Sequence, residues 1–163
     1  MTPATPPPTL FRQIAGSWLS MKTWVKCWLF FLNAVFLGAL FFLDDPASTW
    51  ILIAYAASGP LLIGLIIHQR GLTRLLGIAH LLPWVPLLVY LVGHLGSAQF
   101  GQPITPQSDA RYFAYLSLLL VCLAICLALD AWDVVRYWKG ERYVLGSHEA
   151  VWAGASGANP LTH

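Results

Sequence analysis

Four long apolar stretches dominate the sequence, and each is long enough to cross a lipid bilayer as a helix. Their approximate limits are residues 25–43, 49–67, 72–95 and 112–135. In the bilayer core, a spanning segment satisfies its backbone polar groups only as a helix or within a closed barrel. The sequence therefore predicts an all-α membrane protein with four transmembrane helices in an up-down bundle.

Composition agrees with this prediction. Hydrophobic residues make up 58% of the 163 residues, charged residues only 10%, and the mean hydropathy is +0.65. A soluble domain of this size rarely reaches such values. The first stretch is longer than the apolar region of a secretory signal peptide and is followed by Asp44, Asp45 and Pro46 rather than by a small-residue cleavage site. We therefore expect it to be retained as a helix.

Basic residues are concentrated on one side of the predicted membrane. Eight of the nine Lys and Arg residues flank the stretches on this side: Arg12, Lys22, Lys26, Arg70, Arg74, Arg136, Lys139 and Arg142. The other side has Arg111 together with Asp44, Asp45 and Asp109. By the positive-inside rule, both termini are expected to be cytoplasmic. We expect a bacterial inner membrane, with an organellar membrane as the alternative.

The sequence divides into a hydrophobic middle and two ends of different character. Residues 1–24 form a predicted cytoplasmic segment, residues 25–135 the transmembrane domain, and residues 136–163 a cytoplasmic extension. Within the first segment, a short interfacial helix is predicted over residues 9–20, because apolar residues recur there at helical spacing. These residues are Leu10, Phe11, Ile14 and Trp18.

The two chain ends carry further expectations. The fourth helix is predicted to continue as far as Gly140 or Gly146, because its Trp, Tyr and basic residues suit the headgroup layer. Residues 146–163 are rich in Gly, Ala and Ser, which predicts a disordered tail. Near the other end, Met21 directly precedes Lys22 and is an alternative start to Met1.

His80 is the strongest candidate for a functional residue within the membrane, because a histidine there needs a polar partner. On the fourth helix, Cys126 and Asp130 lie at a comparable depth and share one helix face. Cys122 lies one turn earlier on the same face, and these four side chains together offer ligands for a soft metal ion or groups for a proton relay. The structural alternative is a neutral His80 that donates to a backbone carbonyl freed by Pro83.

A small polar layer is predicted near the middle of the membrane. Asn33 on the first helix finds no water at this depth, so it is expected to hydrogen-bond across a helix contact, with Ser58 as the candidate partner. Pro60 on the second helix interrupts the backbone hydrogen bonds nearby. A polar cavity beside it would suit a transporter, whereas a packed proline kink is the structural alternative.

Ion pairs between helices are expected near the cytoplasmic face, where Asp133 lies at the depth of Arg74 and one turn before Arg136. We interpret these residues as structural rather than catalytic, because nothing nearby supplies a nucleophile or a phosphate cradle. The sequence contains no Walker loop, Rossmann fingerprint, HExxH or GxSxG motif. No catalytic residue and no resident metal or cofactor is therefore predicted.

Three functional hypotheses follow. The first is a non-catalytic accessory, assembly or anchoring subunit of a larger membrane complex. The second is a small oligomeric transporter or channel with a polar path near Pro60, His80 and Asp130. The third is a redox module that binds heme, metal or quinone through His80. The expected partners are the lipid bilayer and other membrane subunits or a second copy of the chain, and the net charge of +2 does not indicate nucleic acid.

Overall fold

The structure, a computed structural model, describes residues 9–96, 104–152 and 154. These residues form α-helices and short 3-10 helices, and no strand occurs among them. In chain order the elements are α1 (Leu10–Leu19), α2 (Thr23–Leu37), η1 (Gly38–Phe42), α3 (Pro46–Gln69), η2 (Arg74–Leu76), α4 (Gly77–Gly96), α5 (Ala110–Trp138) and α6 (His148–Trp152).

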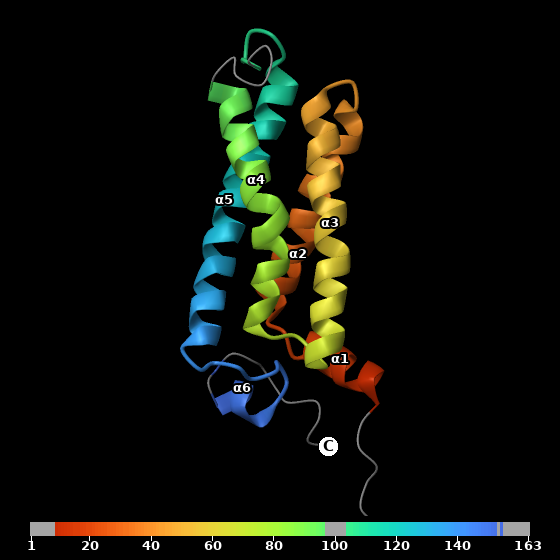
Figure 1. Cartoon of the computed structure of the whole chain (residues 1–163). Helices are drawn as coiled ribbons and strands as arrows, with labels where there is room; N and C mark the ends of the chain where they lie inside the picture. The colour runs from red at the N-terminus through yellow and green to blue at the C-terminus, as the bar shows by residue number, and fades with distance from the viewer. Residues whose placement is uncertain (1–8, 97–103, 153, 155–163) are drawn as a thin grey trace, which may run out of the picture.

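Helices α2 to α5 run up and down in a bundle (Figure 1). Within the described part of the chain, four helices are long and apolar enough to cross a membrane: Thr23–Phe42, Pro46–Gln69, Arg74–Gly96 and Ala110–Trp138. The predicted fold class is thereby confirmed, and each helix bound lies within three residues of the limit expected from the sequence. Helices α1 and α6 lie at the same end of the bundle, termed here the terminal end, and the opposite end is termed the far end.

The outer surface of the bundle is strongly apolar. Phe41 is 86% exposed and Val89 is 62% exposed, and many other large hydrophobic side chains on all four long helices point outward. Water would disfavour such a surface, whereas lipid chains solvate it well. The surface therefore agrees with a protein that is integral to a membrane.

The closest packing in the bundle joins α4 to α5. Buried residues recur on both helices at alternating spacings of three and four, the pattern of two helices packed along a shared seam. They include Trp84, Leu87, Leu91 and His94 on α4 and Tyr112, Leu116, Leu119, Leu123 and Cys126 on α5. At the start of α4, a Cβ atom on Gly77 would lie only 2.8 Å from the carbonyl oxygen of Asp130. The absence of a side chain at Gly77 is what permits this approach.

Three segments pack together at the terminal end to form a cap made of α1, residues 70–73 and residues 144–146. Ser17 of α1 is fully buried, and its Oγ accepts a hydrogen bond of 2.9 Å from the backbone N–H of Leu72. The N–H of Leu145 donates to the carbonyl of Leu72 at 2.8 Å. The helix predicted over residues 9–20 is thus present as α1 and is bonded to the turn between α3 and α4.

Part of the predicted disordered tail is folded. Residues 148–152 form α6, in which Ala150 is fully buried. The backbone N–H of Ala150 donates a hydrogen bond of 3.2 Å to Ser147 Oγ, which caps the helix. The sequence predicted disorder from residue 146 because of its small residues, but Gly146 packs against the end of α1, where an added Cβ would lie 3.1 Å from Ser20 Oγ. Residues 153 and 155–163 of the predicted tail lie outside the described residues.

Replacement of Gly77 by alanine should destabilise the bundle. The added methyl group would meet the backbone of Asp130, and overpacking of this kind costs about 1–3 kcal/mol. Equilibrium unfolding in mixed detergent micelles, followed by tryptophan fluorescence, would measure the loss.

The matched control for this substitution is Gly64→Ala on α3, where no atom lies within 4 Å of the added Cβ. This variant should be neutral or more stable by up to about 1 kcal/mol, because alanine is favoured over glycine in helices. Equal free energies of unfolding for the two variants would show that α4 and α5 do not pack closely at Gly77.

Candidate functional site

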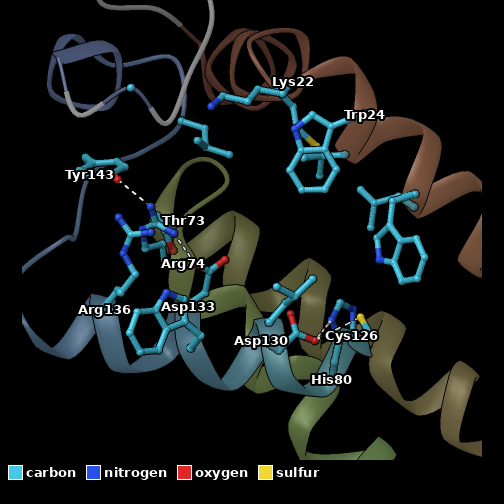
Figure 2. Close-up of a pocket in the computed structure, with 18 residues that line it drawn as sticks. Lys22, Trp24, Thr73, Arg74, His80, Cys126, Asp130, Asp133, Arg136 and Tyr143 are labelled. Atoms are coloured by element: carbon cyan, nitrogen blue, oxygen red, sulfur yellow. Dashed lines mark hydrogen bonds and ion pairs between the residues drawn. The ribbon is translucent and has the colours of Figure 1, made fainter. Parts of the chain in front are cut away.

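His80, Cys126 and Asp130 lie together where α4 packs against α5. His80 Nδ1 is 3.1 Å from Asp130 Oδ2, and the Cys126 thiol donates to the same oxygen at 3.5 Å. One ligand atom from each residue lies within 4.8 Å of the other two, and Cys122, the fourth residue expected from the sequence, does not belong to this group. Figure 2 shows the three side chains as one group on the wall of a cavity. We refer to them as the triad.

Local helix geometry explains why these residues meet. Cys126 and Asp130 are four residues apart on α5, so they lie on the same face one turn from each other. His80 follows Gly77 by nearly one turn of α4, which places it on the face that approaches Asp130. The glycine contact therefore sets the distance between the imidazole and the carboxylate.

The triad lines a cavity of about 480 Å³ at the terminal end, termed cavity 1. Its walls come from α2, η2, α4, α5 and the terminal cap, and they combine several indole rings with groups of both charges. In Figure 2, Lys22 and Trp24 lie across the hollow from the triad. Asp133 and Arg136 lie further along α5, with Arg74 of η2 beside them. Cavity 1 thus has one wall with potential metal ligands and another with paired charges.

The paired charges form a network around Arg74. Its guanidinium group pairs with Asp133 of α5, its Nε lies 3.0 Å from Glu141 Oε2, and its Nη2 donates to the Tyr143 hydroxyl at 2.9 Å. Arg136 contacts both carboxylate oxygens of Glu141 at 2.7 Å. This geometry fixes the end of α5 and the following segment against the start of α4.

The sequence offered Asp133 two partners, Arg74 and Arg136, and the structure pairs it with Arg74. Arg136 pairs instead with Glu141, which the sequence analysis did not single out. The chain turns after α5 at Gly140, whose φ of +112° is in the region that favours glycine. This turn brings Glu141 back to Arg136, and helical periodicity alone does not predict such a reversal.

A second cavity, of about 720 Å³ and termed cavity 2, lies between α1, α2, α3 and α4. Its walls are mainly apolar, and residues such as Phe11, Trp18 and Phe36 contribute aromatic rings. Polar groups also line it, including the predicted candidates His80, Asn33 and Ser58. His80 lines both cavities, whereas Cys126 and Asp130 line cavity 1 and not cavity 2.

Asn33 bonds to a different residue from the one expected. Its side-chain oxygen accepts a hydrogen bond from the Tyr55 hydroxyl, and its Nδ2 donates to the carbonyl of Leu29 at 2.7 Å. Ser58 instead donates to the carbonyl of Tyr55 within its own helix at 2.7 Å. A serine side chain is too short to span the gap, whereas a tyrosine one turn earlier reaches across it. The expected Asn33–Ser58 bond is therefore replaced by an Asn33–Tyr55 bond.

Aromatic rings connect the triad to this polar pair. The His80 ring stacks on Trp84 with a centroid distance of 4.3 Å, Trp84 lies 4.6 Å from Phe36, and Phe36 lies 5.2 Å from Tyr55. Trp84 is only 3% exposed, yet its indole N–H has no hydrogen-bond partner among the described residues. A buried donor without an acceptor costs about 1–3 kcal/mol. Trp84 is also one of the residues that line cavity 2.

A further polar cluster ties the far end together. Asp45 caps the start of α3 and accepts a hydrogen bond from the Tyr112 hydroxyl at 3.1 Å, and Ser48 lies 3.1 Å from the same hydroxyl. His94 Nε2 lies 3.8 Å from Asp45. Neither cavity reaches this level of the bundle, and Pro60 lines neither of them. The cluster was not predicted, because it depends on a loop aspartate turning back toward the bundle.

No protein-family model matches the chain, and no curated protein or solved structure matches it either. Its function is therefore argued from the two cavities and the residues that line them.

The charge network should make the stability of the protein depend on pH. The hydrogen bond from Arg136 lowers the pKa of Glu141 below its usual 4.5. A lowered folded-state pKa stabilises the protein above the usual value, and this contribution is lost as the pH falls through the lowered pKa. Glu141→Gln should therefore lower the thermal midpoint at neutral pH, and the difference from the wild type should vanish in acid.

Thermal unfolding in detergent over a series of buffers would measure this difference. Glu149→Gln on α6 removes the same charge from an exposed position and is the control. A difference between wild type and Glu141→Gln that stays constant with pH would contradict the assigned role of the Glu141 carboxylate.

Proposed function

We propose that the protein is a small membrane subunit that binds an amphipathic ligand of the quinone class in cavity 2. The ligand headgroup would lie near Trp84 and His80, and its apolar tail would follow the hydrophobic walls toward lipid. The proposal joins two of the hypotheses drawn from the sequence, an accessory subunit and a quinone-binding module. The observation that carries it is the buried indole N–H of Trp84 without an acceptor.

The size and the chemistry of cavity 2 support ligand binding. Small-molecule sites are typically concave, about 300–1,000 Å³ in volume and mostly apolar, with a few polar groups that fix orientation. Cavity 2, at about 720 Å³, lies within this range. Its polar groups are few: Asn33 on α2, Tyr55 and Ser58 on α3, Thr73 before η2, and His80 on α4.

The aromatic and polar groups suit a flat ring that carries carbonyl oxygens. The indole N–H of Trp84 is a donor that lacks an acceptor, and a ligand carbonyl would supply one. Phe36 and Trp84 both line the cavity, and their packed rings form an aromatic part of its wall. Leu62 and Ile66 continue the lining along α3 and provide the apolar surface that an isoprenoid or acyl tail requires.

Transport is the less favoured hypothesis. A path near Pro60, His80 and Asp130 would need to connect both ends of the bundle. The residues that line cavities 1 and 2 reach from the terminal end only as far as Phe36 and Tyr55, and none comes from the cluster around Asp45 and His94. This arrangement supports a site that a ligand enters and leaves on one side.

We also propose that the terminal end faces the cytoplasm of a bacterial cell and that the membrane is the inner one. Eight of the nine basic residues precede α2 or lie in its first turn, lie between α3 and α4 or follow the apolar part of α5, and α1 and α6 lie at this same end. The positive-inside rule supports the assignment. A cysteine-accessibility assay on intact cells would test it.

A side chain placed in cavity 2 should block binding. Gly59 and Gly64 both lie on α3 with no atom within 4 Å of an added Cβ, but only Gly59 lines the cavity. Gly59→Leu should weaken the binding of decylubiquinone, measured by quenching of tryptophan fluorescence, by at least about tenfold, since overpacking costs about 1–3 kcal/mol. Gly64→Leu should bind as the wild type does.

Equal affinity in both leucine variants would show that the quinone only partitions into detergent or lipid, and would overturn the proposal. Extraction of the natively expressed protein in mild detergent, followed by mass spectrometry, identifies what occupies the cavity. A phospholipid in stoichiometric amount in place of a quinone would reassign the ligand, and subunits that accompany the protein would identify the complex.

The polar contact can be tested separately with Trp84→Phe, which keeps an aromatic ring and removes the indole N–H. It should weaken quinone binding by about 0.5–1.5 kcal/mol, the usual contribution of one hydrogen bond. Trp50→Phe, on an exposed face of α3 outside both cavities, is the control for loss of a fluorophore. Unchanged affinity of Trp84→Phe would remove the central argument for a carbonyl ligand.

A further inference from the structure

We propose that the triad of His80, Cys126 and Asp130 binds a borderline-soft divalent transition-metal ion such as Zn²⁺ on the wall of cavity 1. The proposal goes beyond quinone binding, because Cys126 and Asp130 do not line cavity 2. Imidazole nitrogen, thiolate sulfur and carboxylate oxygen are the three ligand types that zinc takes in proteins.

The distances between the ligand atoms fit a tetrahedral site. Zinc–ligand bonds of about 2.0–2.3 Å require ligand atoms about 3.3–3.8 Å apart. His80 Nδ1 and Cys126 Sγ lie 3.1 Å and 3.5 Å from Asp130 Oδ2, so two of the three edges are already near this range. The third edge, between His80 and Cys126, is at most 4.8 Å and needs only side-chain rotation to shorten.

The charges of the triad also fit a divalent ion. A thiolate and a carboxylate together carry two negative charges, and a neutral imidazole adds none, so the loaded site would be neutral. Neutrality matters here because an unpaired charge is costly in the membrane interior. The neighbouring carboxylates of Asp133 and Glu141 already pair with Arg74 and Arg136, so they do not compete for the ion.

The geometry leaves a fourth position open on the side of cavity 1. Three protein ligands with an open position is the arrangement of zinc sites that bind water or an exogenous ligand, whereas structural sites have four protein ligands. With about 480 Å³ of space beside the triad, cavity 1 has room for such a ligand. The rigid α4–α5 seam, with Gly77 against Asp130, holds the ligand-bearing helices at the required separation.

Cobalt titration of the full-length protein, purified in mild detergent without a polyhistidine tag and freed of metal by chelation, tests the proposal. Co²⁺ should bind with a single equivalent per chain and give a thiolate-to-cobalt charge-transfer band together with the intense visible bands of tetrahedral Co²⁺. Added Zn²⁺ should displace it. Cys126→Ser should lose the charge-transfer band, and Asp130→Asn should weaken binding by at least about tenfold.

Cys122→Ser is the matched control, because Cys122 is buried one turn earlier on the same helix and does not line cavity 1. It should keep the full cobalt spectrum. Absence of the charge-transfer band in folded wild-type protein, or its persistence in Cys126→Ser, would overturn the proposal and leave the triad as a hydrogen-bonded cluster. Because these variants leave cavity 2 intact, decylubiquinone binding measured on the same samples separates failure of the metal site from failure of the quinone site.

Discussion

The close approach of α4 and α5 at Gly77 determines most of what is distinctive about this bundle. Where a glycine faces the backbone of Asp130, the two helices come nearer than side chains would allow. One turn to either side, the same approach brings His80 against Asp130 and Arg74 against Asp133. In lipid, where water contributes little to helix association, such close backbone contact and interhelical polar bonds are the main attractive forces. A single small residue thus supports both the fold and the candidate site.

The sequence was sufficient for the fold because hydrophobic length is a strong signal. Spans and helix limits follow from the bilayer thickness and the rise per residue, and the structure agrees with both. The same rise predicted which residues share a depth, and His80, Cys126 and Asp130 do lie together. Depth alone, however, does not give rotation about the helix axis. This is why Asn33 was expected to meet Ser58 and instead meets Tyr55, which lies one turn away on the same helix.

Contacts that form where the chain reverses direction could not be predicted from sequence periodicity. Glu141 reaches Arg136 only because the chain turns at Gly140, and Asp45 reaches Tyr112 from a loop at the far end. The two cavities were also not predictable, since an internal volume is the difference between helix spacing and side-chain size. The sequence did identify the residues that carry unusual chemistry for a membrane interior. It was less informative about the aromatic rings that surround them, because Trp and Phe are common in lipid-facing helices.

The first half of α2 differs from the rest of the bundle. The buried residues of α2 are Leu32, Val35 and Phe36, all in its second half, whereas its first half lies beside cavities 1 and 2 and contributes only the partly buried Trp28 to the core. An element with few buried contacts opens at low free energy compared with the α4–α5 pair. Outward swinging of this half-helix would open both cavities sideways into the lipid. A molecule dissolved in the bilayer would then reach His80 by lateral diffusion, without crossing the aqueous phase.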